Sequence, residues 1–166
     1  TAEMLDIAPN SITVHDWKGR FLYANRKTFD LHGYTAEDFM ALSLRDIDVP
    51  ESEARMVERM RMIEENGEAS FEVAHVRKDG TVFPLEVLAK KVLWAGRPAV
   101  LSVATDISER KKAEAELHEA SLRLEATAKA GNIGLWDWDL KANKVFYSAE
   151  WKRQIGYEEH EIGNGL

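Results

Sequence analysis

The chain contains no cysteine, and only 4 of its 166 residues are proline. The lack of cysteine excludes disulfides, thiolate ligands for zinc and any thiol that holds a chromophore covalently. No apolar run approaches the roughly 20 residues of a membrane-spanning helix, and the N-terminus lacks the charged, apolar and small-residue order of a signal peptide. We therefore expect no direct membrane insertion and a cytoplasmic protein.

Basic residues are also fewer than acidic residues. The sequence has 22 Lys and Arg against 29 Asp and Glu, which gives a formal net charge of −7. A nucleic-acid-binding face needs clustered cations to contact phosphates, so no nucleic-acid partner is expected. A hydrophobic content of 45% and a charged content of 31% are typical of a globular protein with one core.

The first part of the chain begins with a strand pattern and continues with helical ones. Residues 12–16 and 21–23 are rich in β-branched and aromatic side chains and flank a turn sequence, which predicts a β-hairpin. Asn25 is a suitable N-cap for a short helix. Further on, Pro50 is expected to open one longer helix that ends at Gly67.

The middle of the chain changes from a helical to an alternating period. Phe71, Val73 and His75 fall on one face of the first strand there. Two more strands, over residues 82–94 and 99–105, follow after turn sequences. Two strands, several helices and then three strands in a meander predict an antiparallel α+β sheet.

A charged helix is predicted after the last strand. Asp106 is suited to cap this helix, and Glu109, three residues later, completes a capping-box pattern. Small and apolar residues recur at intervals of four and three as far as Thr127, which is a thin coiled-coil seam. Gly131 ends the pattern, so we predict a linker helix over residues 109–130 that supports the pairing of two chains.

Residues 131–166 repeat the opening pattern. The pairs Phe146-Tyr147 and Gly156-Tyr157 follow the same order as Leu22-Tyr23 and Gly33-Tyr34. A repeat at this spacing predicts tandem domains, the second of which is truncated. We therefore expect this chain to be a piece of a longer protein.

Together these segments resemble a PAS domain, the sensor module of bacterial histidine kinases, diguanylate cyclases and similar signal-transduction proteins. The pieces that carry the resemblance are Phe21-Leu22-Tyr23-Ala24-Asn25, Leu31-His32-Gly33-Tyr34-Thr35-Ala36-Glu37-Asp38-Phe39, Arg77-Lys78-Asp79-Gly80-Thr81 and Ala104-Thr105-Asp106-Ile107-Ser108-Glu109-Arg110-Lys111. The last is similar to the family signature Asp-Ile-Thr-Glu-Arg-Lys, with Ser108 in place of Thr.

The resemblance implies an α+β PAS fold. Its sheet has five antiparallel strands in the order 2-1-5-4-3, with helices on one face and a C-terminal linker helix. It also implies a division of the chain into a sensor domain (1–108), a signalling linker helix (109–130) and the N-terminal part of a second PAS domain (131–166).

The function that the resemblance implies is sensory. Such a module binds a small ligand, forms a homodimer, or does both, and relays a signal through its C-terminal helix to an output domain of the histidine kinase or diguanylate cyclase type. The alternative is a ligand-free module for dimerisation or protein interaction. Catalysis within this chain is not expected, because the inward strand positions offer only His75 as an acid or base.

The candidate site residues fall into two groups. Those of the pocket are His75, Phe71, Val73, Leu85, Val87, Ser102, Met56, Met60 and Trp94, and those of the signal relay are Asp106, Ser108 and Glu109. A neutral His75 imidazole is suited to orient a carboxylate or a polar ring, or else it is a strand-end histidine bonded to backbone. The apolar stripe is either pocket lining or core, and Trp94 either closes the pocket or covers the sheet edge.

The sequence leaves the cofactor unknown. The resemblance places the reactive cysteine of the blue-light flavin branch near Leu44 and its glutamine near Ala104, so no photoactive flavin–cysteine site is expected. The haem branch uses a histidine on the helix within residues 51–68, where none occurs. Haem bound through His32 or His75 is not expected, and neither is a metal site.

Overall fold

The computed structural model describes residues 5–163. The chain divides into two compact units, residues 1–111 and 112–166, and each is described by itself. Among the described residues, no helix combines the length and the apolar character needed to cross a membrane.

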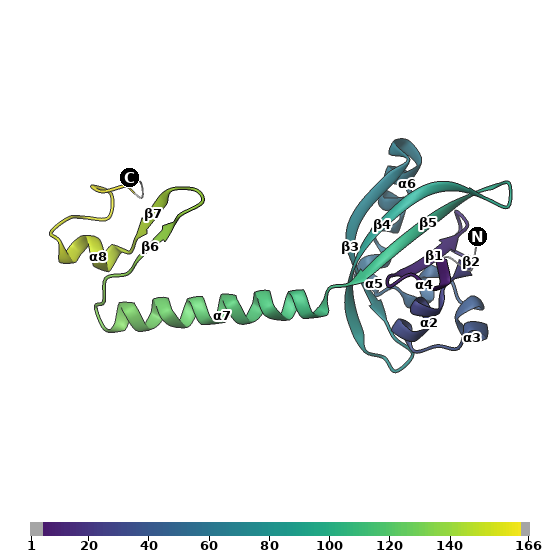
Figure 1. The fold of residues 1–166 in the computed structure, drawn as a ribbon, viewed down its shortest axis with the longest axis horizontal. Coiled ribbons are helices and arrows are strands. Elements are labelled where there is room, and N and C mark those ends of the chain that lie inside the picture. Colours follow the sequence, from purple (N-terminus) through teal and green to yellow (C-terminus); the bar gives the residue numbers. More distant parts are fainter. Residues whose placement is uncertain (1–4, 164–166) are drawn as a thin grey trace. The chain divides into compact units, whose positions relative to one another are not determined.

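The first unit is built on a five-stranded antiparallel sheet in the order β2-β1-β5-β4-β3 (Figure 1). Its strands are β1 (Ser11–His15), β2 (Phe21–Ala24), β3 (Glu68–Val76), β4 (Val82–Trp94) and β5 (Arg97–Asp106). The predicted fold class and strand order are confirmed. Alternation along the strands gives the sheet one face of buried side chains and one of more exposed side chains, as in a half-covered antiparallel sheet.

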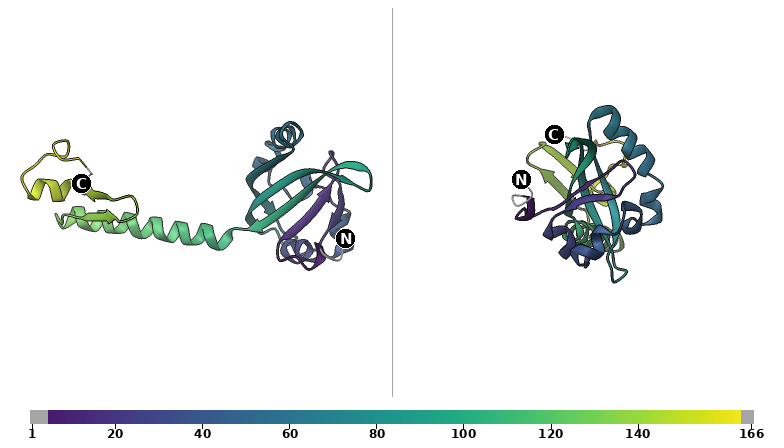
Figure 2. Two further views of the ribbon diagram at one scale, coloured as in Figure 1. Left: turned by 45° about the horizontal axis from the view of Figure 1, so that its top comes forward. Right: turned by 90° about the vertical axis from the view of Figure 1, so that its right-hand side faces the viewer.

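Short helices cover the buried face of this sheet (Figures 1 and 2). They are α2 (Arg26–His32), α3 (Ala36–Met40), α4 (Leu44–Ile47), α5 (Pro50–Glu53) and α6 (Met56–Asn66). The Asn25 side chain accepts the amide of Thr28 and so caps α2, as predicted. Gly33 ends α2 with φ of 74°, a left-handed conformation that favours glycine.

The single long helix expected after Pro50 is a wrong prediction. The structure has two helices, α5 and α6, with Ala54 and Arg55 between them. At the break, the amide of Arg55 donates to the Ser52 carbonyl oxygen three residues earlier, and the buried Ser52 hydroxyl accepts the amide of Ala74 at 3.2 Å, which holds α5 against β3. A periodicity of apolar residues cannot report such a contact.

The core lies between the sheet and the helices. Rows of inward side chains cross the sheet, and one such row runs from Phe71 on β3 through Val87 and Ala104 to Ser11 on β1. The buried apolar residues Ile63, Ala69, Val73, Phe83, Leu85, Val87, Ala89, Val100 and Ala104 form the main cluster. A second cluster consists of Phe21, Ala24, Phe39 and Ile47, so the apolar core between the sheet and the helices has two parts.

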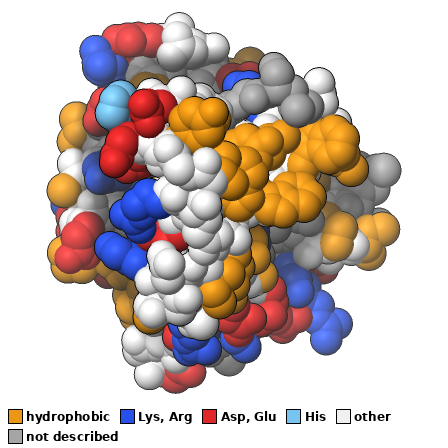
Figure 3. Space-filling model, turned by 90° about the vertical axis from the view of Figure 1, so that its left-hand side faces the viewer, with side chains coloured by type: hydrophobic (Ala, Val, Ile, Leu, Met, Phe, Trp, Pro, Cys, Tyr) orange, Lys and Arg blue, Asp and Glu red, His pale blue; other side chains and the backbone are white. Residues whose placement is uncertain are grey.

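The second unit contains most of α7 (Ser108–Ala130), a hairpin of β6 (Trp136–Asp139) and β7 (Lys144–Tyr147), and α8 (Ala149–Gln154). This order of hairpin and helix repeats that of β1, β2 and α2. Trp136, Trp138 and Phe146 are 62%, 46% and 54% exposed, and apolar side chains gather visibly on one face (Figure 3). That this unit is the start of a second PAS domain stays a prediction.

Candidate functional site

A cavity lies between the sheet and the helices of the first unit. Its lining includes Ser11, Thr13 and His15 from β1, Phe71, Val73 and His75 from β3, Val87, Ala89, Ser102 and Ala104 from β4 and β5, and Met56, Arg59, Met60 and Ile63 from α6. The cavity has a volume of about 60 Å³. One water needs at least ~10–15 Å³ of such space, so the cavity has the size of a few waters.

Most of the predicted pocket residues line this cavity. His75, Phe71, Val73, Val87, Ser102, Met56 and Met60 all do. Leu85 does not, because it is fully buried in the main core cluster. Trp94 lies instead against Tyr23, with 5.5 Å between the ring centroids, which fits the alternative that it covers the edge of the sheet. That these residues bind a ligand stays a prediction.

The polar wall of the cavity is a line of three side chains from separate segments. His32 on α2 places Nε2 3.0 Å from Nδ1 of His75 on β3. Nε2 of His75 lies 3.2 Å from Oδ1 of Asp48, which follows α4. At the other end, Nδ1 of His32 donates to the carbonyl oxygen of Thr28 at 2.9 Å.

Burial lowers the pKa of two histidines of the cavity, His32 and His15. It lowers the pKa of His32 to about 4, with further lowering by His75 and Arg77 and an opposing effect of the bond to Thr28. Burial also lowers the pKa of His15, partly opposed by Asp16. His32 is therefore a neutral imidazole at pH 7 that donates through Nδ1 and accepts through Nε2.

Arg59 supplies the cation of the cavity lining. Its guanidinium donates to the carbonyl oxygens of Ser52 and Glu72, both at 3.2 Å, and stacks over the Phe71 ring at 4.6 Å. Burial lowers the pKa of Arg59, and Asp48 acts to raise it. The polar end of the cavity thus combines an arginine, a carboxylate and two imidazoles, opposite a largely apolar remainder.

The junction of β5 and α7 is built around Asp106. Its carboxylate accepts the amide of Ser108 at 2.8 Å and pairs with Arg77 at 3.2 Å. Partial burial acts to raise the pKa of Asp106, but the contacts with Ser108 and Arg77 outweigh it and hold the pKa below its usual range.

The predicted capping box needs a correction. The helix α7 begins at Ser108, so Asp106 lies one position before the N-cap, although its carboxylate still satisfies the first amide of the helix. Ile107 immediately precedes the helix, is buried, and donates its amide to the Pro84 carbonyl oxygen at 3.1 Å. This bond to β4 sets where the strand ends and the helix begins.

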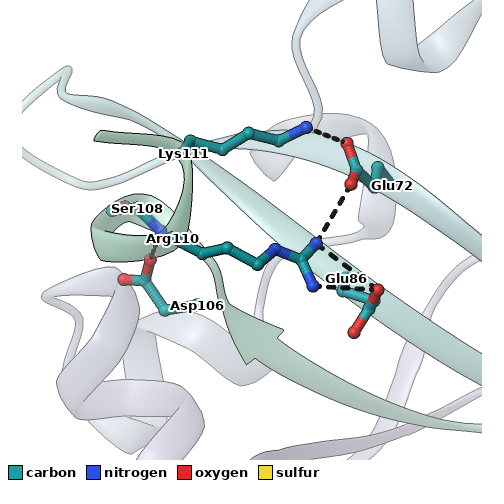
Figure 4. Close-up of polar contacts among 6 residues, drawn as sticks. All are labelled: Glu72, Glu86, Asp106, Ser108, Arg110 and Lys111. Atoms are coloured by element: carbon teal, nitrogen blue, oxygen red, sulfur yellow. Dashed lines mark hydrogen bonds and ion pairs between the residues drawn. The ribbon is translucent and has the colours of Figure 1, made fainter. Parts of the chain in front are cut away.

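Ion pairs fasten the first turn of α7 to the outer face of the sheet (Figure 4). Glu72 on β3 and Glu86 on β4 are direct cross-strand partners, an arrangement in which like charges repel. Arg110 lies between them, 3.1 Å from Glu72 and 3.5 Å from Glu86, and Lys111 pairs with Glu72 at 2.7 Å. Docking of the helix start therefore relieves a repulsion within the sheet.

Sequence reasoning missed several members of the site. Asp48, His32 and His15 were not assigned to the pocket, and Arg110 was not assigned to the relay. His15 could have been assigned from the sequence, because alternation along the first strand places it on the opposite face from Val14. His32 and Asp48 reach His75 only through long-range packing, which no local pattern reports.

Comparison with known proteins places this geometry in a family. Residues 9–109, more than half of the chain, match the model described as PAS domain. The chain belongs to the PAS domain family, whose members are sensory.

Two curated relatives are signalling proteins. The chain is 37% identical over 109 residues to the methyl sulfide methyltransferase-associated sensor of Methanosarcina acetivorans, a match that covers 66% of this chain and 11% of that protein. It is 26% identical over 149 residues to the probable diguanylate cyclase DgcE of Escherichia coli, covering 87% and 13% respectively. The chain thus spans only a small part of these relatives.

Solved structures share the fold. A PAS domain from a two-component sensor histidine kinase matches with a TM-score of 0.56 at 19% identity, over 63% of this chain and 91% of that one. A light-oxygen-voltage domain, from work with a flavin analogue, matches with a TM-score of 0.54 at 23% identity, over 72% and 93%. These likenesses concern the fold alone.

Proposed function

We propose that the first unit senses a small ligand in the cavity between its sheet and helices and relays the binding through Asp106 to α7. The observation that carries this proposal is the combination of an enclosed, mostly apolar cavity with convergent polar groups on one wall. A ligand that fits the cavity at this volume is no larger than a few waters, and a larger one displaces side chains of the lining. We propose that its apolar part lies against Met56 and Met60 and its polar group toward His75.

The proposed relay follows the last strands of the sheet. Ala104 on β5 lines the cavity, and Asp106 ends the same strand two residues later. A ligand that shifts β5 or β3 changes the position of Asp106, and with it the start of α7. Such a shift requires that the ligand bind one arrangement better than the other.

Native mass spectrometry of the purified chain, compared with its denatured mass, tests the ligand. The variant Ala89→Leu adds bulk at a fully buried cavity position, and we expect it to lose any bound mass while it keeps its circular dichroism spectrum. Ala115→Leu on the exposed part of α7 is the matched control and retains the bound mass. If the unmodified chain shows no bound mass under native conditions, this result would favour the ligand-free alternative.

The output and the assembly are parts of the same proposal. The relatives support an output domain of the kinase or cyclase type in a longer protein, and we propose homodimerisation through the exposed seam of α7. Leu117 and Leu124 on that seam are 73% and 58% exposed. A monomeric mass by light scattering at high protein concentration would contradict the dimer.

A further inference from the structure

The buried line of His32, His75 and Asp48 forms the polar wall of the cavity, and its internal contacts are present without a ligand. His32 and His75 are 2% and 8% exposed, and the Asp48 side chain is 5% exposed. Three contacts join the line: His32 to the Thr28 carbonyl oxygen at 2.9 Å, His32 to His75 at 3.0 Å, and His75 to Asp48 at 3.2 Å. All three are within the range of nitrogen–oxygen or nitrogen–nitrogen hydrogen bonds.

A count of protons shows what these contacts require. Each contact needs one proton between its two heavy atoms, so the line needs three. Two neutral imidazoles bring one proton each, and an ionised carboxylate brings none. Because the Thr28 carbonyl oxygen can only accept, one of the two protons must be on Nδ1 of His32. The second proton can complete either the His32–His75 contact or the His75–Asp48 contact, but not both. The contact without a proton then has two buried acceptors facing one another.

We propose that His32, His75 and Asp48 form a binding site for one excess proton, which completes the three hydrogen bonds and gives the group zero net charge. The same number of protons satisfies the line whether the excess proton is on a histidine or on Asp48. Burial disfavours a charge on His32, and Asp48 interacts with the cation of Arg59. The excess proton is therefore assigned to the His75 ring, as an imidazolium paired with a carboxylate.

Charged and titratable side chains from three parts of the fold surround the line of His32, His75 and Asp48. Arg77, which directly follows β3, interacts with His32, and its own charge is partly balanced by Asp106 on β5. Arg59 on α6 faces Asp48, and His15 on β1 lines the same cavity. Two arginines near the line oppose a further positive charge, which limits the site to a single excess proton.

The site joins the cavity wall to the sheet. Asp48 and His75 form a backbone bridge, and the next amide, of Val49, donates to Ala74 at 3.3 Å. When the proton leaves to solvent at high pH, one contact of the line loses its hydrogen bond, and the segment between α4 and α5 is held less firmly on β3. Attachment of this wall thus depends on pH, whether or not a ligand binds.

Net charge, measured by capillary electrophoresis at pH 7, tests the proposal. In Asp48→Asn the amide donates to Nε2 of His75, so two ring protons satisfy the line and the excess proton is not bound. Loss of the carboxylate and loss of the proton cancel, and we expect an unchanged net charge. The control Asp30→Asn removes an exposed carboxylate on α2 and makes the net charge one unit more positive.

Histidine ring NMR of the unmodified chain provides a second measurement that does not depend on folding of the variant. We expect one ring with both nitrogens protonated at pH 7, in addition to a neutral His32, and a release of that proton above pH 7. The exposed His118 and His160 serve as internal references. A one-unit charge change in Asp48→Asn, or single protonation of both His32 and His75 at pH 7, would overturn the proposal, and failure of ligand binding would not affect it.

Discussion

Removal of the Asp106 carboxylate tests how α7 is attached to the sheet. In Asp106→Ala the Ser108 amide loses its acceptor, a capping interaction worth about 1 kcal/mol. The ion pair with Arg77 is also lost, and because its side chains are 25% and 31% exposed, it contributes only about 0.5–1 kcal/mol. We expect the free energy of unfolding to fall by about 1.5–2 kcal/mol, which lowers the melting temperature by roughly 6–8 °C.

Asp106→Asn separates the two contributions. Its amide oxygen still accepts the Ser108 amide, so only the pairing with Arg77 is lost and the destabilisation is about half as large. Hydrogen exchange at residues 108–111 increases in Asp106→Ala and stays near its original rate in Asp106→Asn. Unchanged exchange and an unchanged melting temperature in Asp106→Ala would refute the role of this carboxylate at the start of the helix.

Two further predictions concern charge. Since the pKa of His32 is lowered to about 4 in the folded chain, the unfolded chain binds a proton near pH 6.5 that the folded chain does not bind. The free energy of unfolding therefore falls by up to about 3 kcal/mol between pH 7 and pH 4. Urea titrations of His32→Gln are expected to show a smaller fall. In Arg110→Gln, Glu86 loses its pairing with Arg110, and Lys111 alone still pairs with Glu72. We expect exchange at the first turn of α7 to rise at low salt, and the difference to narrow at high salt. Equal exchange at low salt would contradict the ion-pair attachment.

The sheet was predictable because its evidence is local. A period of two assigned Phe71, Val73 and His75 to one face, and the structure places all three on the cavity lining. The strand order came from the family resemblance, since no local pattern determines which strands become neighbours. Local reasoning failed where long-range contacts matter, as at Ser52, whose bond to Ala74 holds α5 against β3.

The candidate site was predictable only on the strands. His32 and His75 are 43 positions apart, and their contact depends on how α2 packs on the sheet. Trp94 shows the converse error, because its position near the end of a strand was compatible with the pocket, yet it packs on Tyr23. Alternation predicts which way a strand residue points but not what the helices bring to meet it.

Arg77 is the residue through which the cavity and the linker helix are mechanically joined. It lies two residues after His75 on β3, its guanidinium stacks 3.7 Å over the Phe83 ring, and it donates to the Leu31 carbonyl oxygen. The same guanidinium pairs with Asp106. Because these contacts join Arg77 to α2, β4 and β5 together, we expect a displacement of β3 at His75 to change the Arg77–Asp106 contact. The cavity wall and the start of α7 are therefore adjacent parts of one packed network, which supports the proposed relay from His75 to the linker helix.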